Sequence, residues 1–192
     1  MSDKKRDAEV ITLGSGDLMI KEYDEDKGIP TYKDFSAETE LLGRIQGGAA
    51  IEYKGTWYEA KDDSGIAQKT IITEEEATLK SGVITWNGKT LEKLCSTARV
   101  EENNGIRTVK IGGVSNNNGK SYALCFHHKD KVDGDVHVII RGVNQAGFSL
   151  KFAKDKETVI DAEFKCLPQD EEGTLIQYVE EIGVTDTVTV TE

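Results

Sequence analysis

The segment from Lys156 to Leu167 constrains the fold of this chain most, because apolar and charged residues alternate strictly through it. The apolar positions are Ile160, Ala162, Phe164 and Cys166, and the charged positions are Asp161, Glu163 and Lys165. Successive side chains of a strand lie on opposite faces, so this period of two predicts a strand with one buried face and one charged, solvated face. Residues 174–180 follow an acidic turn, and we expect them to pair with this strand as a hairpin.

Strand signals dominate the rest of the chain. The β-forming segments are 9–13, 17–23, 50–60, 68–86, 98–102, 106–111, 122–129, 136–141 and 148–152. Asn103-Asn104-Gly105 predicts a tight hairpin turn, because Asn and Gly tolerate positive φ, and Lys54-Gly55-Thr56 predicts a turn within its segment. Many short strands joined by tight turns indicate a mainly β protein, either a β-sandwich or a barrel.

One helix is predicted beside the sheet. Asn87 is a favourable N-terminal capping residue, and Leu91, Leu94, Cys95 and Ala98 follow it at helical spacing. These four residues form one apolar stripe, so we expect a short helix that flanks the sheet.

Two segments lack a clear pattern. Residues 24–48 contain an acidic start, glycines and no sustained period of two, which predicts a long arm-like loop that becomes ordered against another subunit. Residues 183–192, rich in Thr and Val, predict either a flexible tail or an added strand. The length of 192 residues suits one domain, which we expect to span residues 1–192.

Charge and composition restrict the classes of function. The chain has 24 basic and 35 acidic residues, a net charge of -11, so a basic surface that grips phosphate is not expected. Its three cysteines lack CxxC spacing, which argues against a zinc ribbon or a disulfide scaffold. No apolar run approaches the roughly 18 residues of a membrane span, so we expect no membrane association and synthesis in the cytoplasm.

Two groups of residues are candidates for reactive sites. Glu74, Glu75 and Glu76, with Asp161 and Glu163, could supply the two carboxyl groups of a glycoside hydrolase, but few aromatic platforms accompany them, so a solvated charged face is the better interpretation.

The second group is His127, His128 and His137, which could approach one metal ion. Adjacent strand residues face opposite ways, so ordinary polar surface is favoured. We therefore expect no catalytic residue, no metal site and no cofactor, that is, a protein that is not an enzyme.

Several segments resemble the major tail tube proteins of long-tailed bacteriophages: Ile11 to Leu18, Thr73 to Gly82, Val159 to Lys165 and Gly173 to Leu175. The resemblance implies a β-sandwich with a flanking helix that assembles into six-membered rings, stacked head to tail into a tube that conducts DNA. This fold is also similar to the tubes of contractile injection machines and type VI secretion. The implied location is the virion, after synthesis in the host cytoplasm.

The implied partners are further copies of the chain, a tape-measure protein, a tail terminator and distal tail proteins, with DNA passing through the lumen without specific binding. We expect the lumen to be lined by Asp161, Glu163, Lys165, Glu74, Glu75 and Glu76. An acidic wall would repel phosphates and keep DNA from sticking during transit.

A non-catalytic binding module remains the alternative. A carbohydrate-binding or adhesin-like β-sandwich would share the short strands and the acidity, and Trp57, Tyr58 and Trp86 would form its stacking platform.

Overall fold

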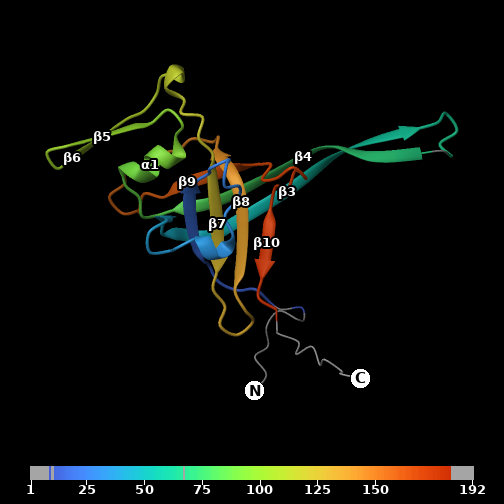
Figure 1. The fold of residues 1–192 in the computed structure, drawn as a ribbon, viewed down its shortest axis with the longest axis horizontal. Helices are drawn as coiled ribbons and strands as arrows, with labels where there is room; N and C mark the ends of the chain where they lie inside the picture. The colour runs from blue at the N-terminus through green and yellow to red at the C-terminus, as the bar shows by residue number, and fades with distance from the viewer. Residues whose placement is uncertain (1–8, 10, 67, 183–192) are drawn as a thin grey trace.

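The computed structural model describes residues 9, 11–66 and 68–182, and its architecture is mainly β, as the sequence predicts (Figure 1). One antiparallel sheet contains eight strands. Seven of them lie side by side in the order β2 (Leu41–Gly43), β1 (Asp17–Glu22), β7 (Tyr122–His128), β8 (Val136–Asn144), β9 (Ile160–Leu167), β4 (Gln68–Val83) and β3 (Ile45–Lys61). The eighth, β10 (Gln177–Glu180), pairs with β8.

The sheet folds back on itself. Strand β8 pairs with β7 along Val136–Gly142 and with β9 along Arg141–Asn144, so it passes from one layer to the other. Arg44 alone separates β2 from β3, the two ends of the strand order. The Arg44 carbonyl accepts a 2.8 Å hydrogen bond from the N–H of Ile84, just beyond β4. The ends of the strand order therefore meet through one residue.

The main core lies between the layer of β1, β7 and β8 and the layer of β9 and β4. Fully buried side chains come from both layers: Leu18, Ile20, Leu124 and Ile140 from the first, and Leu79, Val83, Ile160 and Phe164 from the second. Buried residues alternate with exposed or partly exposed ones along β9, and along β4 from Ala77 onward, because only one face of this layer is covered.

Strands β1, β7 and β8 are buried on both faces. Their second face carries Met19, Cys125 and Ile139, and it is covered by apolar side chains from the segment between β1 and β2: Ile29, Tyr32, Phe35, Ala37 and Leu41.

The long loop predicted over residues 24–48 is present over residues 24–40, but its prediction as an arm that extends to residue 48 and becomes ordered only against another subunit is wrong. Residues 24–40 contain a 3-10 turn, η1 (Tyr32–Asp34), and pack on the domain, and residues 41–48 belong largely to β2 and the start of β3. The runs of consecutive apolar residues in β7 and β8 are the sequence signal that both faces of these strands are covered.

The predicted helix is confirmed. Helix α1 (Gly88–Leu94) begins at Asn87, whose side chain accepts hydrogen bonds from the backbone N–H groups of Lys89 and Thr90. Leu91 and Leu94 join the main core. The predicted hairpin turn is also confirmed, since Asn104 and Gly105 have φ of 49° and 78° between β5 (Arg99–Asn103) and β6 (Ile106–Lys110). A second 3-10 turn, η2 (Val114–Asn116), follows β6.

Two other expectations near the C-terminus have different outcomes. Strand β10 pairs with β8 and not with β9, so the predicted terminal hairpin is wrong. The reason is non-local, because β8 offers a free edge at Val136–Ile139 where its pairing with β9 has not begun. The prediction for residues 183–192 lies outside the described residues.

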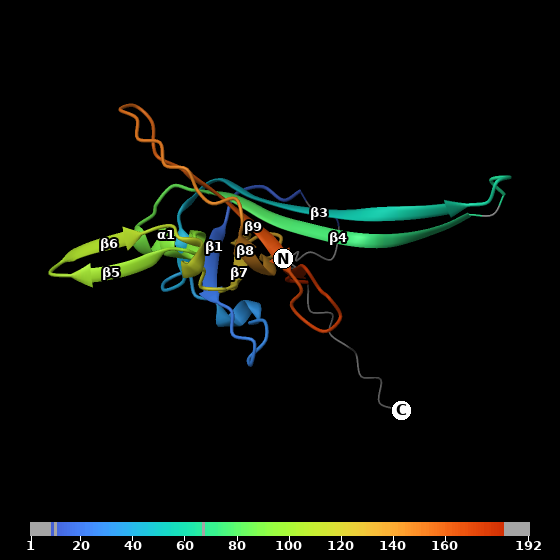
Figure 2. The ribbon, with the colours of Figure 1, turned by 90° about the horizontal axis from the view of Figure 1, so that it is seen from above.

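The part of the molecule that projects is the hairpin of β3 and β4. The two strands run together far past the body in both views (Figures 1 and 2). Residues 68–76 of β4 are exposed without exception, whereas residues 77–83 alternate. The predicted turn at Lys54-Gly55-Thr56 is wrong, because β3 continues through it and pairs with β4 as far as Lys61.

Candidate functional site

The alternation in β9 produces a charged face on the sheet. The apolar residues of the alternation point into the core, whereas Asp161 and Lys165 are exposed and Glu163 is partly exposed. Antiparallel pairing with β4 places Lys165 opposite Thr78 and Glu163 opposite Lys80. The charged face of β9 therefore continues onto β4.

An ion-pair ladder crosses three strands of this face. Lys80 Nζ lies 3.2 Å from Glu52 Oε2 on β3 and 3.8 Å from Glu163 Oε2 on β9. The hydrogen bond to Glu52, followed by the charge of Glu163, raises the pKa of Lys80. Lys80 therefore stays charged and links β3 and β9, the two strands on either side of β4.

The three consecutive glutamates divide between the two faces. Glu74 and Glu76 pair with Thr56 and Lys54 and extend the charged face along the hairpin. Glu75 lies on the opposite face, where its Oε2 accepts a 2.8 Å hydrogen bond from the Tyr53 hydroxyl. Five of the six residues expected to line a lumen thus share one face, and Glu75 does not.

The charged face is only weakly acidic. Its ionisable residues are Glu52, Lys54, Glu74, Glu76, Lys80, Asp161, Glu163 and Lys165. Five carboxylates and three ammonium groups leave a net charge of -2. Sequence analysis missed Glu52, Lys54 and Lys80, although all three lie at charged positions of strand-like segments.

The projecting hairpin carries exposed apolar residues on both faces. Trp57 lies opposite Ile72 and Tyr58 lies opposite Ile71, so an aromatic residue and an isoleucine pair on each face. Trp57 is 65% exposed and Tyr58 is 59% exposed. We call these four residues, together with Tyr53, the hairpin patch.

Two local features build the hairpin patch. A bulge at Thr73 shifts the register between Thr56 and Trp57, and the Thr73 hydroxyl donates a 3.1 Å hydrogen bond to the Thr56 carbonyl. Gly55 leaves room beside Ile72, because a Cβ at this position would lie 2.7 Å from the Ile72 Cδ1 atom. Both features let Trp57 and Ile72 pack against each other.

The outer edge of β3 is open. Strand β3 is last in the strand order, and no strand within the described part of the chain pairs with its outer side. An open edge presents backbone N–H and C=O groups that can pair with another chain. An isolated two-stranded hairpin is also marginally stable in water. The hairpin is therefore the element that most requires a partner.

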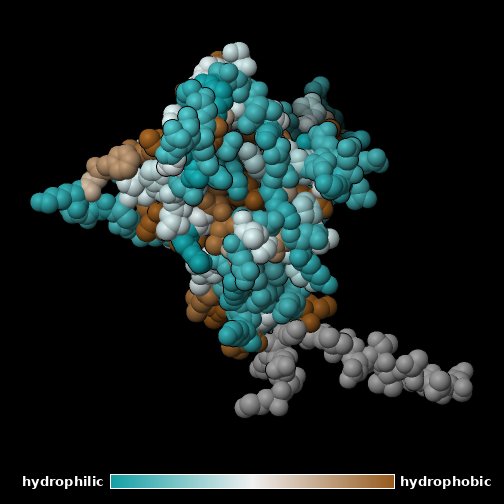
Figure 3. All heavy atoms as spheres, turned by 60° about the vertical axis from the view of Figure 1, so that its left-hand side comes forward, coloured by the Kyte–Doolittle hydropathy of each residue, from teal (hydrophilic) through white to brown (hydrophobic). Residues whose placement is uncertain are grey.

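One further face of the molecule is seen in Figure 3. The face in Figure 3 is mostly hydrophilic, and its hydrophobic residues appear in small separate patches. None of the helices in the described ranges has the length and apolar character needed to cross a bilayer.

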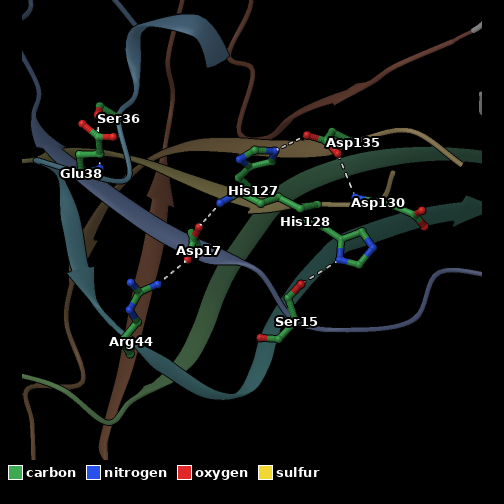
Figure 4. A network of polar contacts seen from close by, with 10 residues as sticks. Ser15, Asp17, Ser36, Glu38, Arg44, His127, His128, Asp130 and Asp135 are labelled. Atoms are coloured by element: carbon green, nitrogen blue, oxygen red, sulfur yellow. Dashed lines mark hydrogen bonds and ion pairs between the residues drawn. The ribbon is translucent and has the colours of Figure 1, made fainter. Parts of the chain in front are cut away.

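The histidines are buried, so the prediction of ordinary polar surface is wrong for two of them. His137 and His128 are 8% and 4% exposed. His127 faces His137 across β7 and β8. His128 faces the other way, and its Nδ1 lies 2.9 Å from the Ser15 carbonyl oxygen (Figure 4). Among residues 9, 11–66 and 68–182, no group of three or more His, Cys, Asp or Glu is placed to hold a metal.

The aromatic residues of the alternative binding module do not form one platform. Trp57 and Tyr58 lie on opposite faces of the hairpin. Trp86 lies beyond the other end of β4, where its ring is 6.3 Å from that of Phe152. The eleven-residue separation along β4 between Ile72 and Val83 corresponds to roughly 35 Å.

Comparisons with known proteins do not assign this chain to a family. No protein-family model matches it, and no curated protein matches it. The functional argument therefore depends on the sequence resemblance and on the surfaces described above.

Proposed function

We propose that this chain is the subunit of a self-assembling tube, of the kind that forms the tail conduit of long-tailed bacteriophages. The observation that supports this proposal most is the projecting β3–β4 hairpin, which has an open edge and an exposed hairpin patch. A second copy of the chain would supply both a strand for the edge and apolar side chains for the patch. Repetition of this contact around an axis gives a ring when the rotation closes, and a separate head-to-tail contact between rings would extend the rings into a tube.

The charged face has the character that a conduit for DNA requires. It is solvated and slightly negative, and each lysine on it has carboxylates on the same face. Phosphates would find no cluster of unpaired cations to which they could bind, so DNA would pass without being held. The wall in this proposal is lined by Asp161, Glu163, Lys165, Glu74 and Glu76, and the position of Glu75 removes it from this set.

The partners of the proposed tube are those that the resemblance implies: a tape-measure protein inside it, and tail terminator and distal tail proteins at its ends. In this proposal the subunit is made in the host cytoplasm and becomes part of the virion. Its role is structural, with no reaction assigned to it.

Electron microscopy of the concentrated protein tests the proposal directly. We expect rings or hollow filaments in negative stain as the protein concentration rises. Particles of one subunit at all concentrations and ionic strengths, also in the presence of the other tail proteins, would contradict it.

Charge reversal on the charged face tests the conduit role separately from assembly. We expect the double variant Asp161→Lys, Glu163→Lys to form tubes, because both positions lie on the solvated face, and to slow DNA ejection from particles, because the wall becomes positive. A matched variant, Asp161→Asn, Glu163→Gln, removes charge without reversing it and should have a smaller effect. Normal ejection from the lysine variant would remove these residues from the lumen wall.

A further inference from the structure

All three histidines of the chain lie at the same end of β7 and β8, where His127 pairs with His137 and His128 pairs with Val136. Figure 4 shows His127 and His128 on β7, with Asp135 beside His127. His127 and His137 are directly opposite in the strand register, and their rings stack with centroids 4.0 Å apart and an angle of 16° between the planes. Asp135 Oδ2 lies 2.8 Å from His127 Nε2. We call His127, His137 and Asp135 the histidine stack.

The histidine stack contacts the segment that covers the second face of the sheet. The ring of Tyr32 lies 4.8 Å from the ring of His137, at an angle of 45°. Tyr32 belongs to the apolar group that packs over Met19, Cys125 and Ile139, which also includes Ile29, Phe35 and Ala37. His137 is thus an ionisable residue of β8 that lies in direct contact with this cover.

We propose that the histidine stack is an acid-sensitive latch, and that protonation of both imidazoles releases residues 29–37 from β7 and β8. His127 Nε2 lies 2.8 Å from the Asp135 carboxylate, so a charged His127 would have a partner in direct contact. His137 is buried under Tyr32 and stacked on the ring of His127, so a charge on His137 would lie in a dry site beside a second imidazole. A charged His137 needs water, and water reaches it when the cover moves away.

The groups around His137 set the direction of the effect. Burial lowers the pKa of His137 and His127 adds to this, whereas Asp135 and Glu181 act in the opposite direction. From the covering segment, Tyr32 faces the ring, and Lys33 Nζ lies 5.5 Å from the centre of the Tyr32 ring.

The folded cover therefore favours neutral His137. This preference for the neutral ring stabilises the folded cover fully above the ordinary His pKa of about 6.5. The stabilisation is lost as the pH falls from there toward the lowered pKa of His137.

Asp135 responds in a different pH range. Burial acts to raise the pKa of Asp135, but hydrogen bonds from His127 and from the Asp130 backbone N–H outweigh it, so the pKa is lowered. Its carboxylate therefore remains ionised while the histidines titrate, and it begins to lose its contribution only below its ordinary pKa of about 4. Opening as the pH falls below about 6.5, before Asp135 is protonated, is thus assigned to His137.

The latch does not depend on the proposed tube. The hairpin patch lies on the projecting part of β3 and β4, whereas the stack and its cover lie on the body, on the outer face of β7 and β8. A protein that never assembles would still show the acid-dependent opening.

Hydrogen exchange of the full-length protein, read by mass spectrometry at pH 7.5 and pH 5.5 and corrected for intrinsic rates, tests the latch. We expect peptides covering residues 29–37 to lose protection by up to about tenfold at pH 5.5, the limit for one histidine with an ordinary pKa of about 6.5, while peptides of β9 change less. The variant His137→Phe keeps a ring under Tyr32 but cannot be charged, and its cover should remain protected at both pH values. His128→Gln, on the other face of β7, should behave as the wild type does.

Two results would overturn the latch. Protection of residues 29–37 that is equal at both pH values in the wild type would show that the stack does not control the cover. Pronounced loss of protection in His137→Phe would place the control elsewhere. If that variant does not fold, titration of the wild-type histidines by NMR decides, because a His137 midpoint at or above about 6.5 contradicts a cover that favours the neutral ring.

Discussion

Replacement of Trp57 by alanine is expected to weaken assembly without affecting the fold of the subunit. Trp57 is 65% exposed on the projecting hairpin, so its removal leaves the two core clusters intact. Surface substitutions of this kind usually change the free energy of unfolding by less than about 0.5 kcal/mol. The loss should appear where a second copy covers the side chain.

The size of the effect follows from the exposed area. A tryptophan offers up to about 250 Å² for burial, so roughly 150 Å² of Trp57 remains to be covered. At about 25 cal/mol per Å² this area is worth at most about 4 kcal/mol in the contact. Because association also orders side chains, we expect a loss of about 2 to 3 kcal/mol. This corresponds to a rise of about 30-fold to 150-fold in the concentration at which assembly begins.

Light scattering against protein concentration measures this threshold, and thermal unfolding of the unassembled subunit provides the stability control. Trp57→Phe retains most of the apolar area and should raise the threshold much less. Ile106→Ala removes a side chain that is 69% exposed on the other hairpin, and it should leave the threshold unchanged. Assembly of Trp57→Ala at the wild-type concentration would refute the role assigned to the hairpin patch.

Three further predictions concern the subunit itself. Asn87→Ala removes the acceptor for the N–H groups of Lys89 and Thr90 and should lower the free energy of unfolding by about 1 kcal/mol in urea titrations. An unchanged free energy of unfolding would show that this cap contributes nothing to stability. Phe164→Ala opens a cavity in the fully buried core and should cost about 3 to 5 kcal/mol in the same assay, whereas a cost below 1 kcal/mol would mean that the core collapses around it. Burial raises the pKa of the Cys125 thiol to about 12, so a thiol reagent at neutral pH should label Cys95 in the native protein and Cys125 only on unfolding; equal labelling rates would contradict this burial.

Local signals in the sequence predicted the elements that form locally. The alternation around Phe164 predicted a one-sided strand, Asn104 and Gly105 predicted a hairpin, and Asn87 predicted the start of the helix. Each of these depends on residues within one turn or one strand, so no distant contact could override it.

Elements that depend on distant partners were missed. Residues 29–37 lack a regular period because they adapt to a surface formed by Met19, Cys125 and Ile139, which the chain assembles from three strands. Strand β10 pairs with β8 because β8 has an open edge there. That open edge results from the sheet topology and cannot be read from the local sequence. Gly55 resembled a turn residue, although its lack of a Cβ serves close packing beside Ile72. For the candidate site, alternation accounts for the one face that Asp161, Glu163, Lys165, Glu74 and Glu76 share and for the position of Glu75 on the other face, while the lining of a lumen stays a prediction.

The single residue between β2 and β3 has a mechanical consequence. Strand β3 runs out along the hairpin, and Arg44 at its base also pairs with Asp17 at the start of β1. Tension applied at the hairpin tip therefore has two routes into the body: along β4 into its ladder with β9, and along β3 through Arg44 into β2 and β1. Neither route contains a slack loop, so a pull from a neighbouring molecule would load both layers of the body together.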